Sequence, residues 1–439
     1  MKGTPYPWIE IAALLLFSIF LVGGASGVPF HPDESSWLFQ SRDLEGLLSD
    51  PASLAWRRDV GATQDVTYRL LNAPLAKYIL GAARLAGGFP ATAVDSDWDW
   101  TKSWEENVRA GALPSERLLR DARRASALLL IPAVIALYLC GRALGGRTTG
   151  LAAAILLATN ALILLHGRRA MAEGALTLGI CLALLGLLYA DRHPWLAGLA
   201  AGLAFSAKTS AAVWIPLGLV AAAWAGDRRN RSLRGTLQRV GAFTLAAGVL
   251  IIGLHPILWA DPPGAVIEMW RARQLLVAAQ VETASEFMPL AVLRTSGDRI
   301  AGILAHLFLT PLQFAEAGNY LRETAAAEAA YLRLEGNTLL RSFFGGSLLF
   351  GLGLLGGVVA IRRDWPAGAG QRRATALAVL ATIVQAVALA GAVPLAFQRY
   401  SLPLVPLVCL WAGRGIASLI DFAKENRRLA SGPAASDSG

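Results

Sequence analysis

The chain has 439 residues, of which 55% are hydrophobic and only 16% are charged. This balance excludes an ordinary soluble enzyme and predicts a polytopic membrane protein surrounded by membrane lipids. Lys and Arg outnumber Asp and Glu by 40 to 31, but the excess lies in short clusters between apolar runs rather than in a basic stripe, so we expect no nucleic-acid partner. Cys140, Cys181 and Cys409 fall inside apolar runs, which argues against a disulfide framework.

The first apolar run, Trp8–Val28, is about 20 residues long, which is enough to cross a bilayer. It resembles a signal peptide, but it is long for the hydrophobic part of one, and its small residues continue directly into an acidic motif. We therefore expect a retained signal-anchor helix.

Further apolar runs follow a polar interval that ends near Arg124, and with the first run they predict about ten transmembrane helices. The expected runs are residues 125–144, 149–166, 170–190, 195–206, 209–226, 240–260, 340–361, 374–393 and 400–421. The run 195–206 is short for a full crossing, so we expect it to be tilted or broken. The predicted fold class is an all-α polytopic membrane protein.

The positive charges predict the orientation of the chain, because cytoplasmic loops carry an excess of Lys and Arg. If Lys2 is cytoplasmic, every basic cluster between the runs falls on the same side of the membrane. These clusters are Arg142 with Arg147, Arg192, residues 228–231, Arg362 with Arg363, Arg372 with Arg373, and the tail with Lys424, Arg427 and Arg428. We therefore expect both termini to be cytoplasmic.

The outer face then carries two large loops, residues 29–124 and 261–339. We expect residues 1–422 to form one transmembrane catalytic domain. The tail, residues 423–439, is rich in Ser, Gly, Pro and Ala, and we expect it to be disordered in the cytoplasm.

The first outer loop contains two segments with the pattern of helices that lie at the membrane interface. Leu70–Ala86 has apolar residues at helical spacing with Lys77 and Arg84 between them. The segment 98–104 is acidic and carries three tryptophans, for which anchoring in the headgroup region is the favoured interpretation.

The acidic pair Asp33-Glu34 directly follows the first apolar run, within the sequence Phe30-His31-Pro32-Asp33-Glu34. A carboxylate pair at a lipid–water boundary can abstract a proton from an acceptor or coordinate a cation. It can equally cap a helix that begins near Ser35. The motif alone leaves capping and catalysis evenly balanced.

Other polar and ionisable residues interrupt apolar sequence, and the expected topology gathers them at outer helix ends. They are Arg168, Arg169, Glu173, Lys208, His255, Asp261, Arg399 and Tyr400. Ionisable groups at such depth are costly and mark functional sites, although Arg and Lys at helix ends also snorkel to the headgroups. For Arg168, Arg169 and Lys208 taken singly, the two interpretations are evenly balanced. Their joint placement near Asp33 favours a shared pocket for an anionic group.

Transfer of a group from a phosphate-linked lipid fits this set of residues. A lipid phosphate needs cations at headgroup depth, and its departure from a sugar needs stabilisation of negative charge. The candidate phosphate contacts are Lys77, Arg168, Lys208 and Arg399. The acceptor hydroxyl needs a base. We expect Asp33 to be that base, with Glu34 as its partner or as the ligand of a cation.

Five short motifs occur in order along the chain. They are Pro32-Asp33-Glu34, Asn72-Ala73-Pro74-Leu75-Ala76-Lys77, Arg168 followed by Glu173, Gly202-Leu203-Ala204-Phe205-Ser206-Ala207-Lys208, and Arg399-Tyr400-Ser401-Leu402-Pro403. In this order they resemble motifs of the GT-C superfamily of integral-membrane glycosyltransferases. The resemblance is to the branch with the protein O-mannosyltransferases and the aminoarabinose transferase that acts on lipid A, and it extends over most of residues 8–421.

The resemblance implies a polyprenyl-phosphate sugar donor, inversion at the anomeric carbon and no direct use of a nucleotide sugar. It implies that Asp33 is the catalytic base, with Glu173 and Tyr400 in support. Asn72 stands where other members have a His or Lys near the donor or a metal, so a divalent cation is possible and the donor sugar, a hexose or a pentose, stays open. The acceptor hydroxyl can belong to a protein, a lipid-linked glycan or lipid A.

The compact form, without the extra domains of larger relatives, leads us to expect a bacterial inner-membrane enzyme with an extracytoplasmic active site. A transporter or lipid flippase is the main alternative, but such proteins place ionisable or broken-helix features near the membrane midplane, often in two related halves. A structural membrane protein without catalysis explains the spans but neither the acidic pair nor the turn at Lys208.

Overall fold

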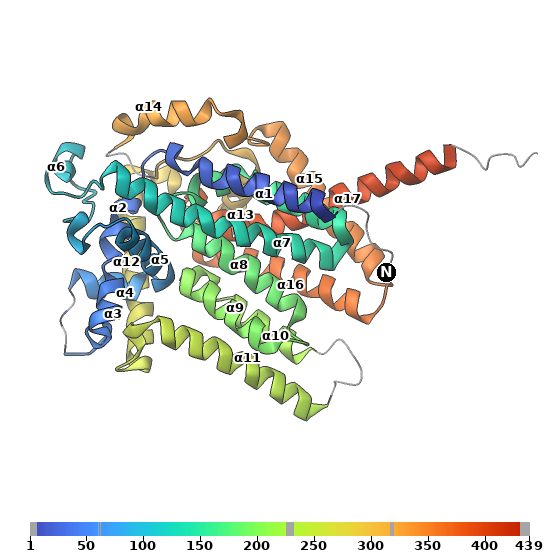
Figure 1. The fold of residues 1–439 in the computed structure, drawn as a ribbon, viewed down its shortest axis with the longest axis horizontal. Helices are drawn as coiled ribbons and strands as arrows, with labels where there is room; N and C mark the ends of the chain where they lie inside the picture. Colours follow the sequence, from blue (N-terminus) through green and yellow to red (C-terminus); the bar gives the residue numbers. More distant parts are fainter. Residues whose placement is uncertain (1–6, 60, 62, 225–231, 317–319, 431–439) are drawn as a thin grey trace, which may run out of the picture.

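The computed structural model describes residues 7–59, 61, 63–224, 232–316 and 320–430, and its long helices form a bundle along the long axis of the molecule (Figure 1). These helices are α1 (Pro7–Gly23), α7 (Glu116–Ala158), α8 (Glu173–Tyr189), α9 (Pro194–Ala207), α10 (Trp214–Ala223), α11 (Leu233–Leu254), α15 (Phe343–Asp364), α16 (Ala369–Ala392) and α17 (Val405–Ala430). They coincide with the apolar runs, because a helix satisfies every backbone polar group inside a membrane.

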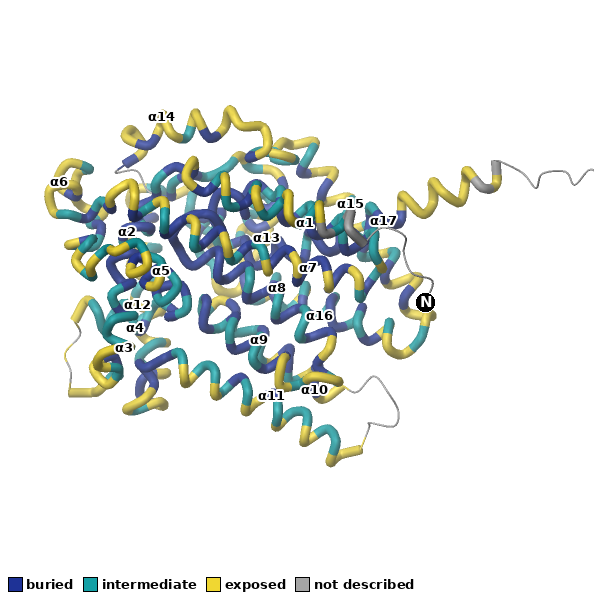
Figure 2. The backbone as a smooth tube through the Cα atoms, viewed as in Figure 1, coloured by how far each residue is buried: buried dark blue, intermediate teal, exposed yellow. Residues whose placement is uncertain are grey.

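Small residues let the helices of the bundle approach closely. A Cβ added to Gly356 of α15 would lie 1.9 Å from the carbonyl oxygen of Trp411 in α17. One added to Gly413 of α17 would lie 2.7 Å from the amide nitrogen of Ala153 in α7. Figure 2 shows the buried residues concentrated along α7, α8 and α9. The core of the protein is therefore the bundle interior, packed through glycine and alanine as is usual for membrane helices.

A second group of helices gathers at one end of the bundle, which we call the head (Figure 1). They are α2 (Pro32–Gln40), α3 (Asp43–Ser49), α4 (Gln64–Leu71), α5 (Pro74–Ala86), α6 (Trp104–Arg109) and α12 (Pro262–Phe287). Helices α13 (Ser296–Leu304) and α14 (Leu321–Leu332) belong to the second expected loop, and α14 is largely exposed. The start of α1 and the C-terminal part of α17 lie at the opposite end (Figure 1).

Helix α7 is interrupted at Gly146, whose φ of 82° and ψ of −172° suit glycine alone. A Cβ added to Gly141 would lie 2.6 Å from the Cα of Gly150. In a straight helix these two residues would be about 13 Å apart. The chain therefore folds back at Gly146, and α7 comprises two packed segments that contain the expected run 125–144 and most of 149–166.

Five helices in the described part of the chain are long and apolar enough to cross a membrane. A sixth span results if Ala12–Gly27 and Pro32–Ser49, which are bent by 102°, count as one broken span. Three further apolar helices, Glu173–Tyr189, Pro194–Ala207 and Thr209–Ala223, are shorter. The all-α membrane fold is confirmed, whereas the expected number of about ten crossings stays a prediction.

The interfacial pattern of Leu70–Ala86 corresponds to the end of α4 and to α5, but its basic residues are not at the surface. Lys77 and Arg84 are each 1% exposed, because they form ion pairs with Asp43 and Glu45 of α3. A neighbouring helix in the same loop thus supplies the carboxylates that make burial of two cations possible.

Two expectations concern the ends and loops of the chain: the disordered tail and the orientation in the membrane. Helix α17 continues to Ala430, so residues 423–430 are helical rather than part of a disordered tail. Residues 431–439 lie outside the described part of the chain, as do Lys2 and residues 228–231, which contribute to the predicted orientation.

Candidate active site

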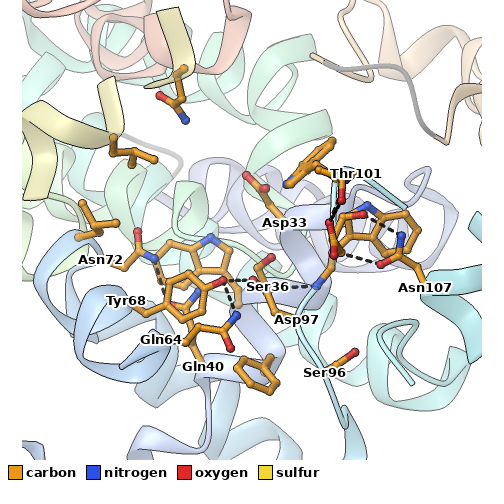
Figure 3. A pocket seen from close by; sticks show the side chains of 18 of the residues that line it. Asp33, Ser36, Gln40, Gln64, Tyr68, Asn72, Ser96, Asp97, Thr101 and Asn107 are labelled. Atoms are coloured by element: carbon orange, nitrogen blue, oxygen red, sulfur yellow. Dashed lines mark hydrogen bonds between the residues drawn. The ribbon is translucent and has the colours of Figure 1, made fainter. Parts of the chain in front are cut away.

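The head contains a cavity of about 780 Å³ (Figure 3). This volume is within the ~300–1,000 Å³ typical of small-molecule sites. Its wall combines carboxylates, cations, amides and aromatic rings, contributed by Asp33, Ser36, Trp37, Phe39, Gln40, Gln64, Tyr68, Leu71, Asn72, residues 95–102, Asn107, Ala110, Glu173, Lys208, Arg273, Leu276, Gln280, Arg399 and Tyr400. Segments from both expected outer loops and from the ends of bundle helices therefore meet at one site.

Asp33 and Glu34 are adjacent in the sequence but have different partners in the structure. Helix α2 begins at Pro32 after the N-cap His31, and Glu34 Oε2 accepts a hydrogen bond of 3.1 Å from the backbone N–H of His31. The side chain of Asp33 instead lines the cavity and forms an ion pair with Arg399. Glu34 thus caps the helix, and Asp33 is the carboxylate at the cavity.

Glu34 also forms a buried ion pair with Arg123 of α7. Its fully buried carboxylate accepts hydrogen bonds from Arg123 Nε at 2.7 Å and Nη2 at 2.6 Å. It accepts a further hydrogen bond of 2.9 Å from the backbone N–H of Ala170. A bidentate pair is strong and directional. Glu34 does not line the cavity, and its contacts hold α2 against α7.

Arg399 lies between two carboxylates. It is paired with Asp33, and its Nε is 3.2 Å from Oε1 of Glu316. Glu316 Oε2 is 2.5 Å from Nε2 of His31. Burial of Glu316 favours its neutral form, but Arg399 and His31 outweigh burial and lower the pKa of this carboxyl below its usual range. Asp33 is therefore one member of a continuous charged network.

Lys208 and Glu173 form a second ion pair at the cavity. Lys208 is the C-cap of α9, Glu173 is the first residue of α8, and Nζ lies 2.7 Å from Oε1. The side chain of Lys208 is 25% exposed and that of Glu173 only 1%. The ammonium group is thus the partner that a ligand in the cavity can reach.

Six of the nine expected site residues line the cavity: Asp33, Asn72, Glu173, Lys208, Arg399 and Tyr400. Asn72 donates a hydrogen bond of 2.9 Å to Gln40, which also lines the cavity. The motifs around the first helix, at the end of α9 and before α17 therefore converge although they are far apart in the sequence.

The other three, Glu34, Lys77 and Arg168, do not belong to the cavity wall. Lys77 Nζ lies 3.2 Å from Asp43 Oδ2 and donates to the carbonyl of Tyr68 at 3.3 Å. Lys77 is thus occupied by protein groups in the head.

Arg168 is buried beside α1, away from the cavity wall. Its guanidinium donates to the carbonyl oxygens of Leu21 and Phe20 at 2.9 and 2.7 Å and to Asn337 Oδ1 at 3.1 Å. These contacts join α1 to the loop that follows α14.

Arg273 of α12 is a cation at the cavity that sequence reasoning missed. Its side chain is exposed, and no ion pair with a carboxylate joins it among the residues that the structure describes. The lining cations Lys208 and Arg399 each have a carboxylate partner. Among the described cations of the cavity wall, Arg273 is therefore one whose positive charge no carboxylate offsets, so it is available to a bound anion. Its only signal in the sequence was its place in the second expected outer loop, residues 261–339, because no motif surrounds it.

Residues 95–102 form an acidic wall of the cavity. Asp97 accepts hydrogen bonds from the hydroxyl of Tyr68 and from the backbone N–H of Trp98, the latter at 2.8 Å. Burial, together with the charges of Asp33 and Asp99, raises the pKa of Asp97 to about 6, although hydrogen bonds from Ser36 and from the backbone of Trp98 lower it. Asp97 and Asp33 are neighbours in the cavity (Figure 3).

Trp98 of this segment is packed inside the head, whereas Trp100 is partly exposed. Trp98 is 3% exposed, and its ring centroid lies 5.6 Å from that of Phe30 and 5.4 Å from that of Trp104. Trp98 and Trp100 both line the cavity. The aromatic cluster therefore fixes the acidic wall next to α2.

The described residues contain no group of three or more His, Cys, Asp or Glu side chains arranged to hold a metal ion. The guanidinium of Arg399 occupies the position beside Asp33 that a cation would take. The residues at the cavity do not fit a metal site, and no step below uses a metal.

Comparison with known proteins identifies a related family model and structures with a similar fold. A family model described as dolichyl-phosphate-mannose-protein mannosyltransferase matches residues 116–259. No curated protein matches the chain significantly. The oligosaccharyltransferase of Archaeoglobus fulgidus in its apo form is similar with a TM-score of 0.54 at 12% identity, over 97% of this chain and 52% of that one.

The archaeal oligosaccharyltransferase AglB from Archaeoglobus fulgidus, in complex with an inhibitory peptide and a dolichol-phosphate, has a TM-score of 0.51 at 14% identity, over 98% of this chain and 52% of that one. The S. cerevisiae Pmt1-Pmt2 protein O-mannosyltransferase complex bound to its sugar donor is 17% identical over 60% of this chain and 35% of that one, with a TM-score of 0.40 that is too low to bear on the fold. The chain spans about half the length of the archaeal structures. These findings confirm a GT-C-like fold and the resemblance to the GT-C superfamily.

Proposed function

We propose that the protein is an integral-membrane glycosyltransferase that moves a sugar from a polyprenyl-phosphate donor to an acceptor hydroxyl. The observation that carries this proposal is the pairing of Asp33 with Arg399 at the wall of a large cavity that also holds Lys208 and Arg273. A base and cations that bind phosphate are the components that such a transfer requires. The family match over residues 116–259 and the GT-C-like fold support the same reaction class.

In the proposed reaction the acceptor oxygen attacks the anomeric carbon of the donor sugar while the bond from that carbon to the phosphate oxygen breaks. Polyprenyl phosphate leaves with the bonding electrons, and the hydroxyl proton passes to the carboxylate of Asp33. Attack on the side opposite the leaving group inverts the configuration at this carbon.

Arg399 couples the two halves of this reaction. Its guanidinium keeps Asp33 ionised before the proton arrives. Once Asp33 is protonated, the positive charge of Arg399 is no longer balanced by that carboxylate and can stabilise the departing phosphate. Glu316 and His31 hold the guanidinium in position during this change.

Arg273 and Lys208 are the proposed contacts of the donor phosphate. Helix α12, which carries Arg273, also exposes Ile267, Trp270 and Leu275 at 67%, 68% and 63%. A helix with a cation at the cavity and large apolar side chains exposed suits the interface between headgroups and acyl chains. We propose that the prenyl chain lies along α12, and that Lys77 and Arg168 support the surrounding structure.

We further propose that the cavity faces the extracytoplasmic side of a bacterial inner membrane and that both termini are cytoplasmic. The position of the cavity at the end of the bundle opposite the start of α1 and the C-terminal part of α17 supports this orientation (Figure 1). The same arrangement favours a transferase over a transporter or lipid flippase, whose ionisable groups gather near the membrane midplane.

The test is transfer of radiolabelled hexose from polyprenyl-phosphate hexose to a membrane extract by the purified full-length protein. Asp33→Asn keeps the shape of the side chain but cannot accept the proton, and we expect activity to fall at least ~100-fold. Asp50→Asn is the matched control, since Asp50 is exposed and lies outside the cavity wall. Equal activity of Asp33→Asn and wild type would remove Asp33 as the base. No transfer by the wild type from any polyprenyl-phosphate sugar would favour the transporter.

A further inference from the structure

The cavity has two unlike ends, with Asp33 between them (Figure 3). Asn72 marks one end; it is the C-cap of α4, against which α12 packs with Arg273. Thr101 and Asn107 mark the other (Figure 3). Two substrates must meet at the base, so a donor bound along α12 leaves the end formed by residues 95–107 for the acceptor.

This second end is negatively charged. Asp95, Asp97 and Asp99 all line it, and the ammonium group of Lys102 is 3.1 Å from Asp99, whose charge it balances. Like charges placed together in a partly buried site repel strongly. A phosphate-bearing acceptor is therefore disfavoured at this end, and an uncharged one is accepted.

Trp98 provides an unused hydrogen-bond donor at the same end. It is 3% exposed and lines the cavity, and its Nε1–H has no hydrogen-bond partner in the described part of the chain. A buried indole N–H without a partner is costly, so a ligand hydroxyl that accepts from it gains free energy.

Trp100 adds a partly open ring surface beside this donor. Its side chain is 39% exposed and lines the cavity between Asp99 and Thr101. An indole flanked by carboxylate and hydroxyl groups suits a pyranose, whose C–H face packs on an aromatic ring while its hydroxyls bond to polar neighbours.

A peptide acceptor is less suited to this end. Extended peptides bind by adding a strand to a sheet edge, and other peptides dock as helices or proline-rich segments in apolar grooves. In the described residues the chain has one isolated β-bridge, between Val292 and Leu395, and neither residue lines the cavity.

We infer that the end of the cavity formed by residues 95–107 is an acceptor subsite for an uncharged sugar, which packs on Trp100 and accepts a hydrogen bond from Trp98 Nε1. This inference rests on the proposed function, because it assumes the transfer that Asp33 and Arg399 perform. The sugar hydroxyl that reaches Asp33 from this side is the one that becomes glycosylated.

The test uses the purified full-length protein in lipid nanodiscs with radiolabelled polyprenyl-phosphate mannose. Three acceptors are compared: methyl mannoside, a phosphorylated mannose and a peptide that contains Ser and Thr. We expect kcat/KM for methyl mannoside to exceed that for each of the other two by at least ~10-fold, because the acidic wall repels phosphate and provides no edge for a peptide.

Variants test the two indoles. Trp100→Ala is expected to raise KM for methyl mannoside ~10-fold, and Trp98→Phe, which keeps an aromatic ring but removes the N–H, about 3- to 10-fold. Hydrolysis of the donor by water, measured without an acceptor, checks that each variant is folded. Trp195→Ala is the matched control, since Trp195 is 52% exposed on α9 and outside the cavity wall.

The outcomes separate this inference from the proposed function. Efficient transfer to the peptide or to phosphorylated mannose, with methyl mannoside no better, overturns the sugar subsite and leaves the transferase intact. An unchanged KM for methyl mannoside in both Trp98→Phe and Trp100→Ala also overturns it. Absence of both transfer and donor hydrolysis in every arm overturns the proposed function and the inference together.

Discussion

The guanidinium of Arg399 pairs with the carboxylate of Asp33, although 366 positions of sequence separate the two residues. The pair joins the first turn of α2 to the segment before α17, and Glu316 contacts the same guanidinium from a third segment. A carboxylate held in this way stays ionised and has a counter-charge ready when it is protonated. In the proposed reaction, this geometry links proton uptake by Asp33 to the charge of the leaving phosphate.

Loss of the charge at Arg399 should make Asp33 easier to protonate, because Arg399 favours the ionised carboxylate. We expect Arg399→Gln to lower kcat/KM at least ~10-fold and to move the acidic limb of the pH–rate profile to higher pH. Arg399→Lys keeps the charge, so its acidic limb should stay closer to that of the wild type. An Arg399→Gln profile that coincides with the wild-type limb would contradict the coupling of the two residues.

Arg273 should contribute to donor binding more than its neighbour Arg271. Both side chains are exposed on α12, but only the side chain of Arg273 lines the cavity. A charge-assisted hydrogen bond is worth about 1.5–3 kcal/mol, so Arg273→Ala should weaken binding of polyprenyl phosphate ~10-fold or more. Arg271→Ala is the matched variant and should change binding less than about 3-fold. Equal dissociation constants for the two variants, measured in nanodiscs, would exclude Arg273 as a phosphate contact.

Features that depend on a short stretch of sequence could be predicted. A run of apolar residues predicts a helix because backbone groups in a membrane have few other ways to pair. The place of Asp33 after the first run, and of Lys208 at the end of α9, follows from the same runs. At both positions the structure agrees with the expectation.

Partner choice could not be predicted, because it depends on elements that only the tertiary fold brings together. The sequence does not reveal that Glu34 pairs with Arg123, whereas its neighbour Asp33 lines the cavity and pairs with Arg399. Lys77 has the spacing of a surface residue, and its burial depends on Asp43 of another helix. Glu316 lies outside any recognisable motif, and its role is visible only from its contacts with His31 and Arg399.

Asp97 should make the stability of the head depend on pH. Its pKa is raised from 3.8 to about 6, so the native state keeps a proton that the unfolded state has already lost. The contribution of this group to the free energy of unfolding therefore falls as pH rises from about 4 to 6 and is constant above that window. Asp97→Asn cannot titrate, and its unfolding temperature should decline less across this window than that of the wild type. Parallel pH dependences of the two proteins would contradict the raised pKa, and Asp50→Asn provides the exposed control.

The pair of Glu34 with Arg123 should stabilise the head far more than a surface ion pair does. The two side chains are 0% and 5% exposed, so Arg123→Met leaves the Glu34 carboxylate buried without its counter-charge. Removing one partner of such a pair costs about 3–5 kcal/mol, whereas exposed pairs contribute about 0–1 kcal/mol. Arg124→Met is the matched variant, since Arg124 is 54% exposed and lies 3.7 Å from Asp121. Thermal unfolding in detergent should therefore show a large fall in the midpoint temperature for Arg123→Met and little change for Arg124→Met. Equal midpoint temperatures for the two variants would show that Glu34 is held by its backbone contacts alone.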